Sequence, residues 1–356
     1  MKKILLIATT PLNVDGITKV EMDTIKYNSS LVKFEVACGY GFNNRYGQEL
    51  EEKGITCINL PKKKSLFRYM FDICKIVKKG NYDVVYVHGN SALMAFEAVP
   101  AKIGGTKYLI THCHNTKTDY PIVHNMIKPL FNKIVDLKLA CSSDAARWAY
   151  NGKNVKIILN GVDISKYRFN KAIREQYRKQ LNLEEMHVIG HVGRFNKQKN
   201  HKKVIDIFAE IYNRDSSARL MLIGDGELKE EIKDYVEERG LSEKVLFLGS
   251  VSNVFDYYQA MDGVLLPSLH EGMCIVALEV QANGMPILLS NTCTEETFAT
   301  SNAYALSIRE EDVIWAEKMI NTLAMGRRDC TDQLIEKGLN IETTMTKIRG
   351  VLLENE

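Results

Sequence analysis

The sequence predicts an α/β protein made of two doubly wound, mostly parallel sheets. The chain has 356 residues, 45% of them hydrophobic and 26% charged, as in an ordinary soluble globular protein. A chain of this length outgrows a single core, so two domains of ~150–190 residues are expected. Short apolar runs rich in β-branched residues alternate with longer amphipathic stretches, and this alternation begins again at Val188. Such alternation is typical of βαβ units.

Six apolar runs form the first series of expected strands. The first run follows Lys2 and Lys3 and imitates a signal peptide, but only five apolar residues precede Thr9, so a buried strand fits better. No window approaches the ~18 consecutive apolar residues of a membrane-spanning helix. The six runs are Ile4–Ala8, Phe34–Cys38, Asp83–His88, Lys107–His112, Leu137–Cys141 and Lys156–Leu159.

A domain boundary is expected near Tyr167. Asn160-Gly161-Val162-Asp163 is typical of a turn, and a charged stretch follows it. We therefore predict domains at residues 1–167 and 168–340, with a helix in the tail 341–356, where apolar residues have helical spacing. The second series of expected strands is Val188–Val192, Arg219–Ile223, Val245–Leu248, Gly263–Leu266 and Pro286–Leu289. The carboxyl edge of each sheet is a candidate nucleotide or sugar site.

The two halves of the chain differ in charge. Residues 1–168 carry 25 Lys and Arg against 14 Asp and Glu, a net charge of +11, whereas the remainder has −8. Lys128 and Lys133 flank Pro129-Leu130-Phe131, and another basic segment lies upstream. Its basic residues are Lys62, Lys63, Lys64, Arg68, Lys75, Lys78 and Lys79, interleaved with Leu66, Phe67, Met70, Phe71, Ile73, Ile76 and Val77. This pattern suits either peripheral contact with an anionic membrane or an ordinary helix with a solvated face. No nucleic-acid-binding module accompanies the charge.

The eight cysteines form no C-x-x-C pair and no tight framework. We interpret them as reduced thiols in a cytoplasmic protein.

The segment 266–279 closes one expected strand and opens a helix. The first amides of such a helix are unpaired and have the positive end of the helix dipole behind them, which suits a diphosphate. Glu271 precedes the helix and Glu279 lies within it, so both carboxylates could accept hydrogen bonds from sugar hydroxyls. The alternative is that Glu271 caps the helix and Glu279 is a solvated surface charge.

A second segment, 190–200, ends the first strand of the second series in a loop that carries Arg194 and Lys199. The two cations could converge on one phosphate group, or they could simply be solvated. In the first domain, His112 and His114 lie two residues apart and should face the same side of a strand end. Three interpretations of these histidines are open: they bind a metal ion, they are hydrogen-bonded structural residues at a strand end, or His114 contacts the substrate. No further metal ligand has suitable spacing. His88, which ends another strand, is a further cleft candidate.

These motifs resemble the retaining glycosyltransferases of family 4, which have the GT-B architecture of two Rossmann-like domains facing a central cleft. The motifs are Gly193-Arg194-x4-Lys199, Gly224-Asp225-Gly226, Glu271-Gly272-x6-Glu279, Gly284-Met285-Pro286 and Asn160-Gly161-Val162-Asp163. The likeness runs from Lys2 to the tail. His112-Cys113-His114-Asn115-Thr116 and the segment around Trp315 resemble the branch that builds capsular and exopolysaccharides.

The resemblance implies a nucleotide-sugar donor, with UDP favoured over GDP, held mainly by the second domain. In the family, the positions matching Arg194 and Lys199 hold the diphosphate, Glu271 meets the donor sugar and Glu279 binds the ribose. The family cradle also includes Gly193, Gly272 and the amides of Met273, Cys274, Ile275 and Val276, while Gly16 and His114 approach the donor from the first domain. His88, His112 and Asn115 are expected on the acceptor side, and the tail helix is expected to pack back on the first domain.

The expected reaction is transfer of a hexose or N-acetylhexosamine from a UDP-sugar to a saccharide acceptor, lipid-linked, with retention. No metal ion is expected, because two cations and the helix amides stabilise the departing diphosphate. Such an enzyme is expected in the cytoplasm, in peripheral contact with the plasma membrane. A GT-B sugar-nucleotide epimerase and a non-catalytic nucleotide-sugar sensor are the alternatives. The sequence assigns no oligomeric state.

Overall fold

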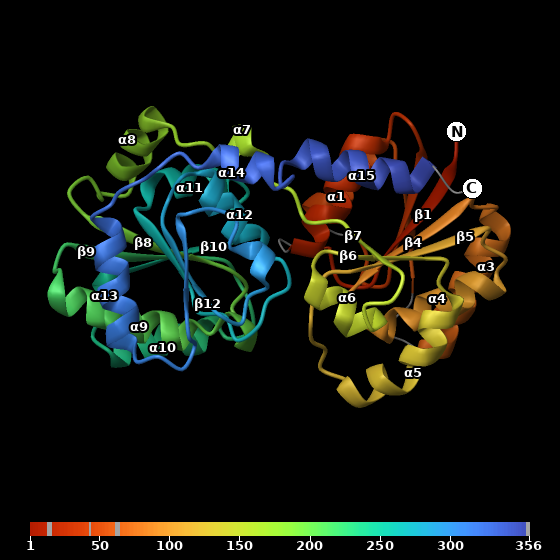
Figure 1. Cartoon of the computed structure of the whole chain (residues 1–356), viewed down its shortest axis with the longest axis horizontal. Helices are drawn as coiled ribbons and strands as arrows, with labels where there is room; N and C mark the ends of the chain where they lie inside the picture. The colour runs from red at the N-terminus through yellow and green to blue at the C-terminus, as the bar shows by residue number, and fades with distance from the viewer. Residues whose placement is uncertain (13–15, 43, 61–64, 354–356) are drawn as a thin grey trace. The chain divides into compact units, whose positions relative to one another are not determined.

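A computed structural model describes the chain except for residues 13–15, 43, 61–64 and 354–356. It divides the chain into two compact units, each of which is α/β, and this confirms the predicted fold class (Figure 1). Unit 1 is Met1–Asn160 together with Glu342–Glu356, and unit 2 is Gly161–Ile341. The predicted boundary residue Tyr167 lies in unit 2.

Unit 1 contains a seven-stranded parallel sheet in the order β3-β2-β1-β4-β5-β6-β7. The strands are β1 Lys3–Ala8, β2 Lys33–Cys38, β3 Thr56–Asn59, β4 Val84–Gly89, β5 Tyr108–Cys113, β6 Leu137–Ala140 and β7 Val155–Ile157. All six predicted runs form strands here, and β3 is an edge strand that the pattern did not indicate.

The helices of unit 1 cover both faces of this sheet. They are α1 Gly16–Asn28, α2 Arg45–Glu52, α3 Leu66–Gly80, α4 Ala95–Ile103, α5 Pro121–Ile134, α6 Ser143–Tyr150 and α15 Ile341–Leu353. Helices α1 and α15 lie on one face, and α4, α5 and α6 on the other (Figure 1). Arg349 of α15 donates to the Asn28 side chain and to the Tyr27 carbonyl, both at 3.2 Å. The tail therefore completes unit 1.

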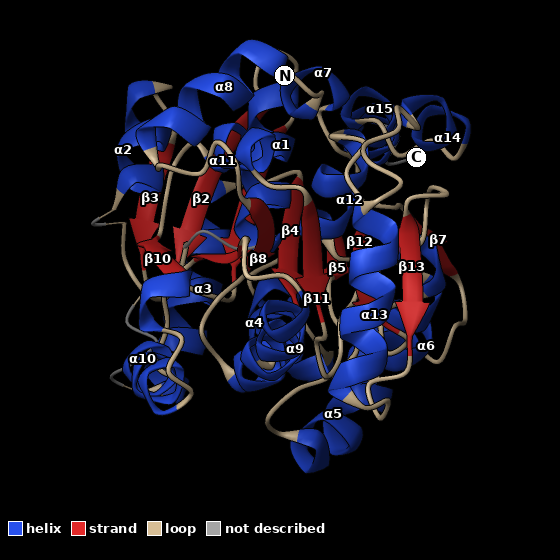
Figure 2. Cartoon of the chain, turned by 90° about the vertical axis from the view of Figure 1, so that its left-hand side faces the viewer, coloured by secondary structure: helices blue, strands red, loops and turns tan. Residues whose placement is uncertain are grey.

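Unit 2 contains a six-stranded parallel sheet in the order β10-β9-β8-β11-β12-β13. The strands are β8 His187–Val192, β9 Ala218–Ile223, β10 Val245–Gly249, β11 Gly263–Leu266, β12 Ile287–Ser290 and β13 Ala303–Leu306. The helices are α7 Ile164–Tyr167, α8 Lys171–Gln180, α9 His201–Arg214, α10 Lys229–Glu238, α11 Val254–Ala260, α12 Ile275–Ala282, α13 Asp312–Leu323 and α14 Thr331–Glu336. Figure 2 shows α13 against α9 beside these strands. Trp315 of α13 is fully buried in the core of this unit.

The strand order of each sheet reverses once, between β1 and β4 in unit 1 and between β8 and β11 in unit 2. Loops that leave the carboxyl ends of strands at such a reversal diverge and leave a crevice for ligands. Most of the residues singled out from the sequence lie at or just after the carboxyl ends of β4, β5, β8 and β11, so each sheet brings its own set together at one edge. Among the described residues, no helix combines the length and the apolar character needed to cross a bilayer.

Candidate active site

The two phosphate-suited segments of unit 2 lie side by side. The amide of Leu269, in the loop after β11, donates to the Gln198 carbonyl at 2.8 Å. The side-chain amide of Asn200 donates to the Pro267 carbonyl at 3.1 Å. Because β8 and β11 are neighbours in the sheet, their carboxyl-end loops meet and are held together by these bonds.

Lys199 and Glu271 form the central ion pair of this site. The Lys199 ammonium donates to Glu271 Oε1 at 2.6 Å, and the Gln198 side chain donates to Oε2 at 3.1 Å. The two charged side chains are only 13% and 10% exposed. Burial alone would lower the pKa of Lys199, but the Glu271 carboxylate raises it above its ordinary value. The lysine is therefore a fixed cation directly before α12, and the solvated alternative is wrong for it.

Arg194 occupies a different environment from Lys199. Its guanidinium pairs with Glu227 at 3.2 Å, and both side chains are more than half exposed. Glu227 belongs to the loop after β9, which also binds the arginine loop through the Phe195 amide and the Asp225 carbonyl at 3.0 Å. The structure thus holds Arg194 at the same edge of the sheet, in a solvated ion pair.

Two glycines let the loops approach closely. A Cβ on Gly193 would lie 3.0 Å from three side-chain carbons of Lys199, whose stem crosses this glycine. Gly224 has a φ of +141°, and a Cβ there would lie 2.0 Å from the Gly193 carbonyl oxygen. Gly193 therefore leaves room for Lys199, and Gly224 in turn leaves room for Gly193.

The predicted phosphate cradle at the start of α12 differs in one amide. Helix α12 begins at Ile275, and the Cys274 amide donates to the Thr297 hydroxyl at 3.4 Å. Within the part of the chain that is described, the amides of Ile275 and Val276 have no acceptor. The Gly272 carbonyl accepts from the Thr294 hydroxyl at 3.4 Å, and Met273 is buried beside it. The amides of Ile275 and Val276 therefore have the geometry to receive an anion, whereas the Cys274 amide is engaged by Thr297.

Glu279 is buried, so the alternative of a solvated surface charge is wrong. Its carboxylate accepts from the hydroxyl of Tyr167 at 2.7 Å and from that of Tyr258 at 2.9 Å. Burial and the neighbouring Glu279 carboxylate raise the pKa of Tyr258 well above its ordinary value, so the phenol stays a donor. Neither tyrosine was expected from the sequence as a partner of Glu279.

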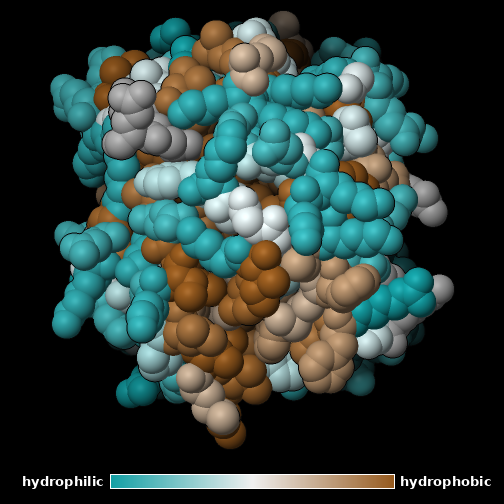
Figure 3. All heavy atoms as spheres, turned by 90° about the vertical axis from the view of Figure 1, so that its right-hand side faces the viewer, coloured by the Kyte–Doolittle hydropathy of each residue, from teal (hydrophilic) through white to brown (hydrophobic). Residues whose placement is uncertain are grey.

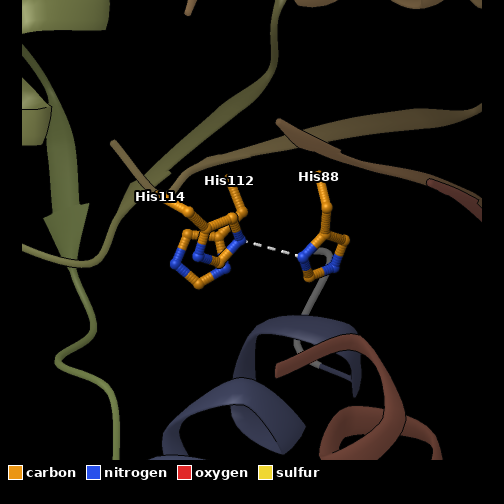
Figure 4. A group of neighbouring side chains, drawn as sticks. All are labelled: His88, His112 and His114. Atoms are coloured by element: carbon orange, nitrogen blue, oxygen red, sulfur yellow. Dashed lines mark hydrogen bonds between the residues drawn. The ribbon is translucent and has the colours of Figure 1, made fainter. Parts of the chain in front are cut away.

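In unit 1, His88, His112 and His114 form a buried three-histidine cluster (Figure 4). The rings of His112 and His114 lie 4.1 Å apart, as expected for residues facing the same side. His88 Nδ1 and His114 Nε2 share a hydrogen bond of 3.0 Å, and the Tyr86 hydroxyl lies 2.8 Å from His112 Nδ1. One nitrogen from each ring lies within 4.8 Å of the others. The expectation that no further metal ligand accompanies His112 and His114 is therefore wrong, because His88 completes a set of three.

Burial lowers the pKa of all three imidazoles, that of His114 to about 3, so the cluster is neutral near pH 7. The bond between His88 and His114 uses one nitrogen of each of those rings, and Tyr86 contacts one nitrogen of His112. Each ring therefore has at most one nitrogen left for an ion or a substrate. The absence of a metal requirement stays a prediction.

Two further residues of unit 1, Gly16 and Asn115, were expected at the site. Gly16 is the exposed first residue of α1. Asn115 is half-buried, and its carbonyl accepts from the Cys113 thiol at 3.3 Å. Asp15 and Lys62, Lys63 and Lys64 lie outside the described residues.

Comparisons with known proteins show which sequences and folds the chain resembles. Residues 173–338 match the family model described as glycosyl transferases group 1. The putative glycosyltransferase EpsF of Bacillus subtilis (strain 168) is 29% identical over 265 residues, 71% of this chain and 69% of that protein. The capsular polysaccharide biosynthesis glycosyltransferase CapH of Staphylococcus aureus is 27% identical over 291 residues, 79% of each chain. The crystal structure of Anabaena HepE in complex with UDP-glucose superimposes with a TM-score of 0.83 at 19% identity, over 99% of this chain and 100% of that one.

The chain has the GT-B fold, and its residues 173–338 belong to the glycosyl transferases group 1 family.

A more distant relative has a more detailed name. It is the UDP-Gal:alpha-D-GlcNAc-diphosphoundecaprenol alpha-1,3-galactosyltransferase of Escherichia coli, 23% identical over 325 residues, 84% of this chain and 82% of that protein. The group 1 match lies entirely within unit 2, the unit that contains the Lys199 and Glu271 pair.

Proposed function

We propose that the enzyme transfers a hexose or N-acetylhexosamine from a UDP-sugar to a saccharide acceptor that is lipid-linked, in the synthesis of a capsular or exopolysaccharide. The names of CapH and of the E. coli galactosyltransferase support the pathway and the acceptor, and the UDP-glucose complex of HepE supports the donor. The proposal places the enzyme in family 4, in the cytoplasm. One observation carries it: a nearly buried lysine paired with Glu271, the carboxylate that precedes helix α12 and its two unpaired amides.

The chemistry follows from the charges that develop during transfer. As the bond from the anomeric carbon to the diphosphate breaks, negative charge grows on the diphosphate. Lys199, Arg194 and the amides of Ile275 and Val276 are the groups that would stabilise it, which makes a metal ion unnecessary. Glu271 would accept a hydrogen bond from a hydroxyl of the donor sugar, and Glu279 from the ribose.

Retention of configuration is part of the proposal. In this scheme a departing phosphate oxygen takes the proton of the acceptor hydroxyl, and the acceptor attacks the face that the phosphate leaves. No side-chain base is then required, which agrees with a site of unit 2 whose carboxylates are already engaged by Lys199 and by two tyrosines.

Radiolabelled UDP-sugars provide the test. The enzyme would be incubated with a panel of them, with and without a polyprenyl-diphosphate saccharide acceptor, in the presence of EDTA. We expect label in the lipid fraction only when the acceptor is present. The NMR spectrum of the product should show the same anomeric configuration as the donor sugar. Isomerised sugar nucleotide without acceptor would mean an epimerase, and binding without turnover would mean a sensor. A strict requirement for a divalent metal would overturn the metal-independent scheme.

The nucleotide is tested separately by thermal unfolding with UDP-, GDP- and ADP-sugars. A ligand at 100 times its dissociation constant stabilises the folded state by about 2.7 kcal/mol. Stabilisation by GDP- or ADP-sugars alone would show that the donor nucleotide is not UDP.

A further inference from the structure

Helix α5 turns an apolar face toward solvent. Ile122, Met126 and Leu130 are spaced four residues apart and are 74%, 75% and 54% exposed. The opposite face is anchored in the unit, because His124 stacks on Trp148 with ring centroids 4.0 Å apart and Phe131 is fully buried. A surface helix of a soluble protein normally shows the reverse polarity. The exposed face formed by Ile122, Met126 and Leu130 is therefore a surface that an apolar binding partner would cover.

The apolar surface continues on the neighbouring helices. Phe67 and Phe71 of α3, also four residues apart, are 85% and 67% exposed, and Ile103 at the end of α4 is 72% exposed. Helix α4 packs against both α3 and α5, so the three helices form one layer. Figure 3 shows apolar side chains gathered on the lower half of this side of the molecule. We call Phe67, Phe71, Ile103, Ile122, Met126 and Leu130 the apolar face.

Basic residues accompany the apolar face. Lys75, Lys78 and Lys79 are exposed on α3, and Lys133 is exposed near the end of α5. Acidic groups on these helices are few: α5 has none, Glu97 of α4 is buried and accepts from the Tyr69 hydroxyl at 2.7 Å, and Asp72 of α3 lies 3.9 Å from Arg68. On the described part of these helices, apolar side chains thus lie together with an excess of positive charge.

We propose that the apolar face binds the surface of an anionic lipid bilayer, with its six side chains inserted at the boundary between headgroups and acyl chains. Exposed patches of this kind mark interaction sites, and interfacial helices use this combination of apolar and basic residues. A second copy of the chain is a poorer occupant, because it would bring the same lysines into contact with themselves. Under the proposed function, binding to the bilayer would bring the enzyme to its lipid-linked acceptor. The binding itself does not depend on sugar transfer.

The test is cosedimentation of the full chain with vesicles. We expect binding to vesicles of phosphatidylglycerol and phosphatidylcholine, weak binding to phosphatidylcholine alone, and a decrease at high salt. Replacing Met126 or Ile122 by serine should each weaken partitioning about tenfold, as expected when one large apolar side chain loses its burial. Met325→Ser and Ile335→Ser are matched controls, because these side chains are comparably exposed in unit 2.

Unchanged melting temperatures would confirm that the variants fold, since the altered side chains lie in solvent. Equal partitioning of Met126→Ser, Met325→Ser and the parent protein would overturn the proposal. So would a concentration-dependent dimer that Met126→Ser abolishes while vesicle binding is absent, because the apolar face would then join two copies. Vesicle binding that survives loss of all transferase activity separates this inference from the proposed function.

Discussion

Replacing Lys199 by methionine removes a nearly buried cation while preserving most of the side-chain volume. In the variant, the Glu271 carboxylate keeps only the hydrogen bond from Gln198, at 3.1 Å. Removing one partner of a buried ion pair costs roughly 3–5 kcal/mol, and the residual exposure of both groups places this pair near the lower figure. For a unit of this size, about 3 kcal/mol corresponds to a fall in melting temperature of ~6–12 °C.

Turnover should fall for a separate reason. Losing one preorganised contact to the developing negative charge typically costs ~3 kcal/mol in the transition state, or ~10²–10³ in kcat. The double variant Lys199→Met with Glu271→Gln separates the two effects, because it leaves no unpaired buried charge. We expect its melting temperature to recover most of the loss while its kcat stays low, as measured by scanning calorimetry and by transfer of radiolabelled sugar.

Lys197→Met is the matched control, since Lys197 lies in the same short helix, Lys197–Lys199, and is exposed. It should leave both melting temperature and kcat near the parent values. If the double variant regained turnover together with stability, Lys199 would act only through its pair with Glu271, and the reasoning would be refuted. Near-normal kcat in Lys199→Met alone would remove the residue from the mechanism.

Three other perturbations test the remaining parts of the site. Glu279→Ala should weaken UDP binding more than Tyr258→Phe, which removes only one of two phenol donors; calorimetric titration with UDP giving the parent affinity for both would contradict a ribose role. Gly224→Ala should lower both stability and kcat, because its Cβ would collide with the Gly193 carbonyl; an unchanged melting temperature would show that the loop yields. The three-histidine cluster is neutral when folded, so its stabilising effect is complete above pH ~6.5 and is lost as the pH falls toward 3, by up to ~1.4 kcal/mol per pH unit for each ring. Unfolding between pH 7.5 and pH 5, with the exposed His187→Gln variant as control, should show this slope, and a flat profile would exclude it.

The interior strands were predictable because they are buried on both faces and so are nearly continuous apolar runs. The strands that escaped prediction, β3 and β13, pair along one side only, and their residues are mostly half-buried. The segment Thr56-Cys57-Ile58-Asn59 of β3 mixes polar and apolar residues, and a loop can have the same composition. Burial on a single face leaves too weak a pattern to distinguish the two.

The candidate site was predictable as far as it depends on strand order. Lys199 and Glu271 come together because the strands before them are neighbours, and the βαβ pattern implies that arrangement. The tyrosines that bind Glu279 were not predictable, since Tyr258 reaches it from α11, a contact that depends on helix packing. The acceptor of the Cys274 amide, Thr297, likewise follows a different strand.

The outward apolar side chains of α3 illustrate a third limit. The sequence of α3 interleaves basic and apolar residues, and this pattern alone does not show which apolar residues face the sheet. The structure buries Tyr69, Ile73 and Val77, and this places Phe67 and Phe71 outside. The membrane hypothesis therefore gains residues that can be altered without disturbing the core.

The two predicted diphosphate cations are both paired with carboxylates before any donor binds, but their pairs differ in strength. The exposed pair of Arg194 and Glu227 is worth ~0–1 kcal/mol, so the arginine can turn to a phosphate at little cost. Lys199 is held by a buried carboxylate, and a diphosphate must compete with Glu271 for it. If Glu271 then binds a sugar hydroxyl, the intact donor compensates the carboxylate that the lysine releases, whereas UDP alone does not. The site is therefore expected to favour UDP-sugar over UDP by more than the contacts of the sugar alone would give, and Glu271→Gln should reduce that preference in competitive titrations.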